Sequence, residues 1–414
     1  DLWVGESWQR SLSASSAPTR WSVSGLPPGI VFSAETATLS GNPRVAGRYA
    51  VGVQAINEAG KSIVERFELR VAQVADLIGS FVGTVHPVAN SDLTGGWLKL
   101  ALSRGGVMTG EVRLGPNRYR VRQSLVTTRL MNGSVKMESA GFFALDTGWL
   151  MKVGFDSATQ TFEGDIRLSN NGLILPIKGV RASRHGLETQ EVTQAGKHTV
   201  ALLAPITATG PTGAIHGVLE VRRDGSARWA GKLGDGAAVT ASTAVSLTGR
   251  LPLHLDAGAG KGRAQAWLQV GDDTLFAVNT EASFWARRQG GPPPRSHVSG
   301  FYLTGLEGRG GRYVAPSTGE LLFDLPNPPG RLRLGTEFGS SYAAVAPNWE
   351  QDLDAGRPDR LVVIAQDARN LKVIVNRARG IFEGSWTENG RRAILGGVLL
   401  SGQKEAWGHA LLDL

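Results

Sequence analysis

Residues 21–71 decide the fold of this chain, and their sequence is WSVSGLPPGIVFSAETATLSGNPRVAGRYAVGVQAINEAGKSIVERFELRV. Residues 26–29, Leu-Pro-Pro-Gly, predict a turn because proline fixes φ and glycine permits a positive φ. Residues 40–43, Ser-Gly-Asn-Pro, predict the next turn. Between the turns apolar residues alternate with polar ones, as at Val51 and Val53, which is the period of a half-buried strand. The segment therefore predicts a small β-sandwich of short strands.

This stretch resembles the immunoglobulin-like domains of bacterial surface proteins, which are related to cadherin-like folds. The resemblance lies within residues 3–72 and is carried by residues 25–29 (GLPPG), 39–43 (LSGNP), 47–49 (GRY) and 55–60 (AINEAG). It implies a β-sandwich that serves as a spacer or an adhesive link. Ala37 stands where the family usually has a glycine, so we expect another turn type at that position.

Beyond residue 75 the chain repeats a hairpin pattern, in which a strand contains a glycine and ends at a turn signal. The pattern recurs at residues 105–125, 161–180, 225–246 and 380–400. In three copies the glycine stands two residues after an aromatic residue, which gives the pairs Phe162/Gly164, Trp229/Gly231 and Phe382/Gly384. A glycine within a strand indicates a bend or the close approach of another backbone.

The sequence predicts an all-β protein, with an N-terminal immunoglobulin-like β-sandwich followed by two or three antiparallel β-barrel or β-meander domains. Barrels are favoured because hairpins leave sheet edges exposed unless the sheet closes. We expect the sandwich at residues 1–74, a barrel-like domain at 75–190 and a second barrel-like region at 191–414. The Gly-Gly-Pro-Pro-Pro run marks a candidate division of that last region near residue 290.

The hairpin region is similar to repeat segments of large extracellular proteins from Verrucomicrobia and their relatives. The similarity is carried by residues 198–202 (HTVAL), 217–249, 251–253 (LPL), 380–386 (GIFEGSW) and 397–400 (GVLL). It implies an extracellular location and no particular activity.

Composition narrows the classes of function. The chain has no cysteine, which excludes disulfides, thiol nucleophiles and cysteine-bound metal clusters. It has no apolar run long enough for a membrane span and no signal peptide, and its start at Asp1 suggests a mature product or a fragment. A net charge of +8 suits anionic partners. We expect a secreted or cell-surface protein of a bacterial outer envelope.

Catalytic motifs are missing from the sequence. It has no nucleophile elbow in a strand–turn–helix setting, and its seven histidines lack metal-ligand spacing, so we expect surface or strand-end histidines and neither a metal nor another cofactor. Asp352 and Asp354 would share one face of a strand and could serve as a glycosidase pair. The residues that follow, 355–359, favour a solvated loop instead.

Arginines form the most distinctive local pattern. Arg118, Arg120 and Arg122 alternate, so on a strand they share a face, and Arg113 lies on the partner strand of the same hairpin. Four guanidinium groups could bind a sulfated or carboxylated glycan or a phosphate, but we favour a charged, solvent-facing side of a half-buried sheet as the explanation. Among the eleven tryptophans, a sugar-stacking platform competes with core packing, which we favour, at Trp97, Trp149, Trp229, Trp285 and Trp386.

These observations favour a non-enzymatic extracellular or cell-surface structural or adhesive protein. Its rigid β modules could associate into a homo-oligomer or polymer through edges and flat faces. Two alternatives stay open: a module that binds acidic polysaccharides, and a β-fold carbohydrate-active hydrolase. Nucleic acid is not expected as a partner, since the basic residues are scattered and no nucleic-acid-binding motif occurs.

Overall fold

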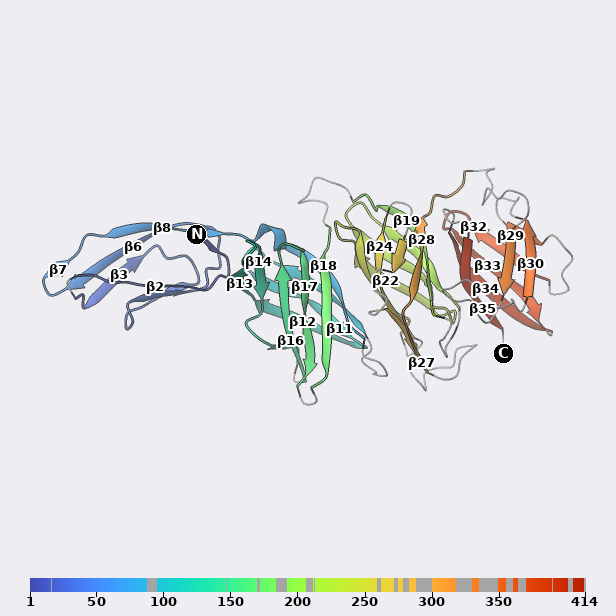
Figure 1. The fold of residues 1–414 in the computed structure, drawn as a ribbon, viewed down its shortest axis with the longest axis horizontal. Coiled ribbons are helices and arrows are strands. Elements are labelled where there is room, and N and C mark those ends of the chain that lie inside the picture. The colour runs from blue at the N-terminus through green and yellow to red at the C-terminus, as the bar shows by residue number, and fades with distance from the viewer. Residues whose placement is uncertain are drawn as a thin grey trace. The chain divides into compact units, whose positions relative to one another are not determined.

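The computed structural model describes residues 1–15, 17–87, 95–146, 148–169, 172–183, 192–205, 211, 213–258, 262–271, 275–277, 283–287, 300–317, 330–334, 349–354, 360–363, 370–388, 390–400 and 405–412. Within them the chain forms β-strands, and its helical element is the short 3-10 helix Ala75–Leu77 (Figure 1). The predicted all-β class is therefore confirmed.

Two compact units divide the chain. One contains residues 1–85, 98–113 and 117–181, and the other contains residues 86–97, 114–116 and 182–414. The domain boundaries expected after residues 74 and 190 stay predictions. The candidate division near residue 290 lies outside the described residues.

The N-terminal sandwich has two sheets (Figure 1). The first contains, in order, β1 (Leu2–Trp3), β8 (Glu65–Ala72), β6 (Gly47–Asn57) and β3 (Arg20–Ser24), with β7 (Gly60–Lys61) paired to β6. The second contains β2 (Trp8–Ser11), β5 (Thr38–Gly41) and β4 (Ile30–Ser33). Val51 and Val53 of β6 pack in its core with Leu2 and Leu69, so the predicted alternation is confirmed at these residues.

The turn between β4 and β5 contains Ala37, where the family pattern has glycine. Ala37 adopts a φ of +50°, which is the left-handed region that an L side chain rarely occupies. The chain therefore keeps a glycine-type backbone here with an alanine, and the methyl group strains the turn.

We predict that Ala37→Gly raises the free energy of unfolding by about 1 kcal/mol, because the left-handed conformation costs glycine no steric strain. Urea denaturation measures the change. Ala34→Gly is the matched control in the same turn, because Ala34 is not among the residues with positive φ. It should leave stability unchanged or lower it. Equal effects of the two substitutions would contradict the explanation.

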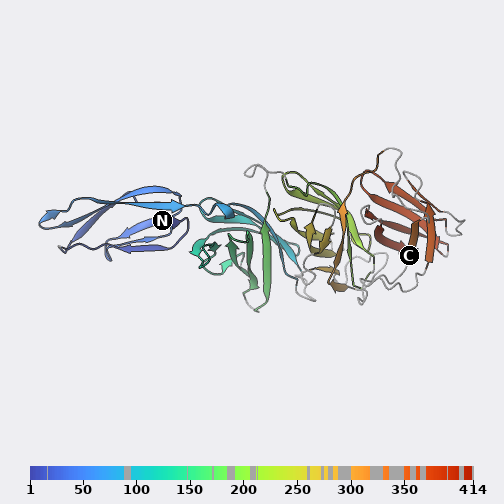
Figure 2. The ribbon, with the colours of Figure 1, turned by 45° about the horizontal axis from the view of Figure 1, so that its top comes forward.

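A ten-stranded sheet follows the sandwich. Its order is β12 (Asn117–Ser124), β11 (Val107–Leu114), β10 (Gly96–Leu102), β9 (Gly79–Val85), β18 (Ile174–Arg181), β17 (Thr161–Leu168), β16 (Trp149–Asp156), β14 (Val135–Glu138) and β13 (Val126–Arg129), with β15 (Phe143–Ala144) paired to β16. Figure 2 shows these strands curving around a common interior. There the ring centroid of Phe155 lies 4.8 Å from that of Phe81 and 5.6 Å from that of Phe162.

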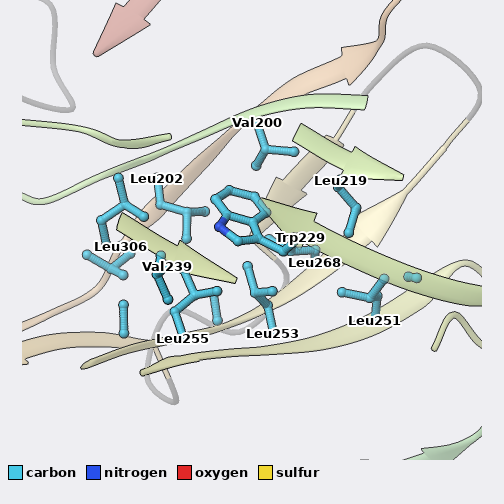
Figure 3. Close-up of a cluster of buried hydrophobic side chains, with 14 of the residues drawn as sticks. Val200, Leu202, Leu219, Trp229, Val239, Leu251, Leu253, Leu255, Leu268 and Leu306 are labelled. Atoms are coloured by element: carbon cyan, nitrogen blue, oxygen red, sulfur yellow. The ribbon is translucent and has the colours of Figure 1, made fainter. Parts of the chain in front are cut away.

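Two five-stranded sheets, the sheet pair, come next. One has the order β22 (Ala238–Ala244), β21 (Ser226–Lys232), β20 (Ile215–Val221), β19 (Gly196–Leu203) and β28 (Glu307–Arg312). The other has the order β23 (Arg250–Asp256), β24 (Arg263–Val270), β26 (Phe284–Arg287) and β27 (Phe301–Thr304), with β25 (Leu275–Ala277) paired to β24. Trp229 is buried in their core beside Leu219, Leu253 and Leu268 (Figure 3).

The sheet pair and the ten-stranded sheet share one strand succession. In the ten-stranded sheet β9, the first strand in the sequence, lies between β10, the second, and β18, the last. The sheet pair also consists of ten strands, β19 to β28, and its first strand, β19, likewise lies between β20, the second, and β28, the last. Two stretches of sequence therefore fold by one plan, as the recurring hairpin pattern suggests.

The seven-stranded sheet completes the described chain. Its order is β29 (Gly330–Leu334), β30 (Trp349–Asp354), β31 (Arg360–Val363), β32 (Lys372–Asn376), β33 (Ile381–Glu388), β34 (Arg391–Leu400) and β35 (Glu405–Leu412). Its core includes Val373, Phe382, Trp386 and Leu395.

The glycines of the four hairpin copies have another backbone beside them, as predicted. A Cβ on any one of them would lie under 3.0 Å from a carbonyl oxygen of the preceding strand. The glycines are Gly110, Gly164, Gly231 and Gly384, and the carbonyls belong to Lys99, Lys152, His216 and Lys372 respectively. Only glycine lets the two paired strands approach this closely.

An aromatic ring lies over a second set of glycines. Phe162 of β17 is the register partner of Gly179 of β18, which is itself the partner of Gly83 of β9. A Cβ on either of these two glycines would collide with the Phe162 ring. The seven-stranded sheet repeats the register with Phe382, Gly397 and Gly408, and the Phe382 ring lies over Gly397, so β35 holds the place that β9 holds in the ten-stranded sheet.

We predict that Gly179→Ala lowers the free energy of unfolding by about 1–3 kcal/mol, because its methyl group displaces the packed Phe162 ring. Gly141→Ala is the control in the same unit, since no atom lies within 4 Å of a Cβ there and φ is not positive. Thermal unfolding of the three proteins measures both effects. A Gly179→Ala protein as stable as the control would contradict this role of the ring.

Candidate functional site

The arginine pattern lies on the outer surface of the ten-stranded sheet. Arg118, Arg120 and Arg122 of β12 are exposed, while Val121 between them is buried. Arg113 lies on β11, the neighbouring strand, and is half-buried. The structure therefore brings the four predicted arginines to two adjacent strands of one sheet.

Charge on this surface is mostly positive. Along β10, β11 and β12 the charged side chains that alternate with core residues are one acid, Glu111, and five bases. The five are Lys99, Arg113, Arg118, Arg120 and Arg122, and we call them the basic face. Glu111 is ion-paired with Arg118. Guanidinium groups in this density suit sulfate or carboxylate groups, which accept paired hydrogen bonds from them.

Tryptophan does not extend the basic face into a sugar-stacking platform. Trp149, Trp229, Trp285 and Trp386 are buried, so their rings pack in cores. Trp97 is half-buried. Core packing, the interpretation we favoured from sequence, is confirmed for the four buried rings.

The candidate carboxylate pair lies on a strand and not in a loop. Asp352 and Asp354 belong to β30, where Asp352 pairs with Arg331 of β29 and Asp354 pairs with Val362 of β31. The solvated loop expected there was therefore wrong at these two positions, because ladders on both sides hold the backbone extended. Side chains of β30 lie outside the described residues.

Three histidines are buried, although surface or strand-end positions were expected for all seven. His198, His216 and His409 are buried. His216 of β20 and His409 of β35 are stacked, with ring centroids 4.9 Å apart and an interplanar angle of 18°. His216 Nδ1 donates a hydrogen bond of 3.0 Å to the Ala214 carbonyl oxygen, whereas His409 Nδ1 is buried without a hydrogen-bond partner.

Burial keeps both stacked imidazoles neutral. Loss of hydration lowers the pKa of His216 to about 4, with the Ala214 carbonyl acting in the opposite direction. Burial likewise lowers the pKa of His409 to about 3; repulsion from His216, whenever that ring is protonated, and from Lys232 adds to the effect, and a hydrogen bond with the Gly396 backbone opposes it. The sequence gives no local sign of this pair, because its members belong to strands far apart in the chain.

A junction of hydrogen bonds joins the N-terminal sandwich to the ten-stranded sheet within one unit. Thr127 Oγ1 donates a buried hydrogen bond of 2.6 Å to the Val4 carbonyl oxygen, and the Thr127 amide donates one of 3.0 Å to the Gly5 carbonyl. Glu6 forms a parallel bridge with Thr127 and accepts hydrogen bonds of 2.9 and 3.1 Å from Arg129. These contacts join the residues after β1 to β13 by one backbone hydrogen bond and by the side chains of Thr127, Glu6 and Arg129.

A second junction joins the sheet pair to the seven-stranded sheet within the other unit. The Ala214 amide donates to the Gly408 carbonyl oxygen at 2.9 Å, and Thr199 Oγ1 donates to the Leu399 carbonyl oxygen at 2.6 Å. An apolar cluster surrounds these bonds and contains Ala201, Ala214, Val398 and Leu400. The stacked histidines belong to this junction.

Metal-ligand clusters and membrane-spanning helices are both absent from the described residues. No group of three or more histidine, aspartate or glutamate side chains is placed there to hold a metal ion. In the same part of the chain, no helix has the length and apolar character to cross a membrane.

Comparison with known proteins identifies the N-terminal sandwich alone. Residues 7–72 match the family He_PIG, described as "Putative Ig domain". Immunoglobulin-like domains of this kind are typically non-enzymatic modules of surface and structural proteins. No curated protein and no solved structure matches the chain. The expected immunoglobulin-like domain is thus confirmed, whereas the similarity to Verrucomicrobial repeats stays a prediction.

Proposed function

We propose that this protein is an extracellular or cell-surface structural protein whose β modules act as stiff spacers. The junction between the N-terminal sandwich and the ten-stranded sheet carries the proposal. A flexible linker would leave two modules free to turn, whereas here Thr127 bonds to two successive carbonyls of the β1 end and Arg129 clamps Glu6. Modules that are held at fixed angles suit a spacer, which keeps its two ends a set distance apart.

The immunoglobulin-like domain supports the same function, because modules of that kind occur in surface proteins. The junction between the sheet pair and the seven-stranded sheet supports it too, because an apolar cluster and backbone hydrogen bonds hold those sheets together. Association with further copies of the chain stays a prediction.

Spin labels test the stiffness directly, because a chain without cysteine accepts two labels at chosen sites. Cysteines at Lys61 on β7 and Ala158 after β16 report across the junction, and both positions are exposed. We expect their distance distribution to be as narrow as that of the control pair Arg104 and Ala158, which lies within one sheet. Pulsed electron paramagnetic resonance measures both distance distributions.

Thr127→Val combined with Arg129→Ala should broaden the distribution across the junction. The valine leaves the Val4 carbonyl without its donor, at a cost of about 1–3 kcal/mol. The control pair should not change. A broad distribution in the parent protein would overturn the spacer proposal.

The basic face favours a second candidate function, binding of acidic polysaccharide. Arg120→Glu with Arg122→Glu should weaken binding of heparin or polygalacturonate at least ten-fold, about 1.4 kcal/mol, because both exposed donors become repulsive. The matched control is Arg66→Glu with Arg70→Glu, which changes the same charge at exposed positions of β8. Titration calorimetry measures the dissociation constants. Equal losses in both proteins would show attraction by net charge alone and would contradict a site on the basic face.

A further inference from the structure

His216 occupies a position that holds lysine in the other three hairpin copies. The strand that precedes each copy contains one residue whose carbonyl oxygen faces the motif glycine. These residues are Lys99, Lys152, His216 and Lys372. The strand registers agree, since Val153, Gly217 and Val373 directly follow three of them and pair with Gly164, Gly231 and Gly384. The four positions are therefore equivalent in the fold.

The environments of the four positions differ in one respect. Lys99, Lys152 and Lys372 are exposed, whereas only 4% of His216 is exposed. The cover over His216 comes from β35, whose His409 stacks on it. A lysine there would have to bury an ammonium group, while an imidazole can lose its charge within the physiological range.

Few charged groups surround the stacked pair. Lys232 of β21 is the register partner of His216, and its Nζ lies 3.1 Å from Oε1 of Glu383 on β33. Both act electrostatically on His216, in opposite directions, and Lys232 also acts on His409. The carboxylate of Glu383 is thus occupied by Lys232. A proton on either imidazole would place a cation on a buried ring near Lys232.

We propose that the His216–His409 stack is an acid-sensitive latch between the sheet pair and the seven-stranded sheet. With both imidazoles neutral the rings stack and β35 stays on β20. Protonation of either ring drives it toward water, which is reached by separating β35 from β20. The bonds lost with the latch are those of the same junction, including the Ala214–Gly408 hydrogen bond.

The direction of the pH effect follows from linkage. Each folded-state pKa is lowered from 6.5, to about 4 for His216 and about 3 for His409. Between those values and 6.5 the separated state binds more protons than the docked state, so docking weakens as pH falls. Docking is fully present above pH 6.5. At pH 5 we expect it to be weaker by about 30-fold for each imidazole that reaches water.

Hydrogen exchange on the full chain tests the latch. Peptides covering residues 213–217 and 405–412 report the junction, and a peptide covering β17 reports a strand in the other unit. After correction for intrinsic exchange rates, protection of the junction peptides should fall at least ten-fold between pH 7.5 and pH 5, while protection of β17 stays constant. Protection of the junction that does not depend on pH would overturn the proposal.

Variants separate the latch from general acid sensitivity. His216→Lys introduces the residue of the other three copies and should lower junction protection already at pH 7.5, whereas full protection at that pH would count against the latch. His216→Phe with His409→Phe keeps two stacked rings without protons to gain and should remove the pH response. His254→Gln, on β23 of the sheet pair, should retain the response of the parent.

Nuclear magnetic resonance of the parent protein gives a test that needs no variant. Imidazole resonances should include two that titrate well below pH 5.5. If every histidine titrates near pH 6.5, no neutral buried pair exists and the latch is refuted, even where the double phenylalanine variant fails to fold.

Discussion

The close approach of paired strands at glycine is the constraint on which the architecture depends. At Gly164 and its three counterparts a carbonyl of the neighbouring strand fills the space of a side chain. At Gly179 and Gly83 the Phe162 ring also occupies this space. Strands that approach this closely can coil strongly, and the aromatic ring restores the apolar contact that two glycines lack. A tightly curved sheet with its own core follows from these contacts.

Repetition of that constraint explains why separate parts of the chain share a plan. The ten-stranded sheet and the sheet pair place their first strand between their second and last strands. The seven-stranded sheet keeps the register of Phe382, Gly397 and Gly408 and the contact of the Phe382 ring with Gly397. There a strand at the end of the sequence, β35, fills the place that a first strand fills elsewhere. The edge that would be exposed beside β34 is thereby paired.

Modules that solve the same folding problem can still differ in what their outer surfaces do. On the ten-stranded sheet the outer surface of β10 to β12 stays in solvent and keeps lysine and arginine. On the sheet pair β35 covers the equivalent of the Lys99 position, and the residue there is the buried His216. Burial selects the side chain, because an ammonium group loses far more hydration energy than a neutral imidazole. The difference converts a solvated surface into a junction.

Local pattern was sufficient for the fold class and for much of the detail. Alternation at Val51 and Val53 located a core strand, and glycines two residues after Phe162, Trp229 and Phe382 indicated where backbones approach. The arginines of β12 share a face because side chains alternate along any strand. Each of these features depends on neighbours in the sequence or on hairpin partners a few residues away.

Tertiary structure alone decided which surfaces are covered. The alternation of a strand separates its two faces but does not tell which face another sheet will bury. For that reason the sequence could not show that His216 meets His409. Nor could it show that Asp352 and Asp354 are held in a ladder, since their pairing partners lie on two other strands, β29 and β31. Sequence determined how each strand is built, and packing between distant strands determined what each exposed or buried side chain can do.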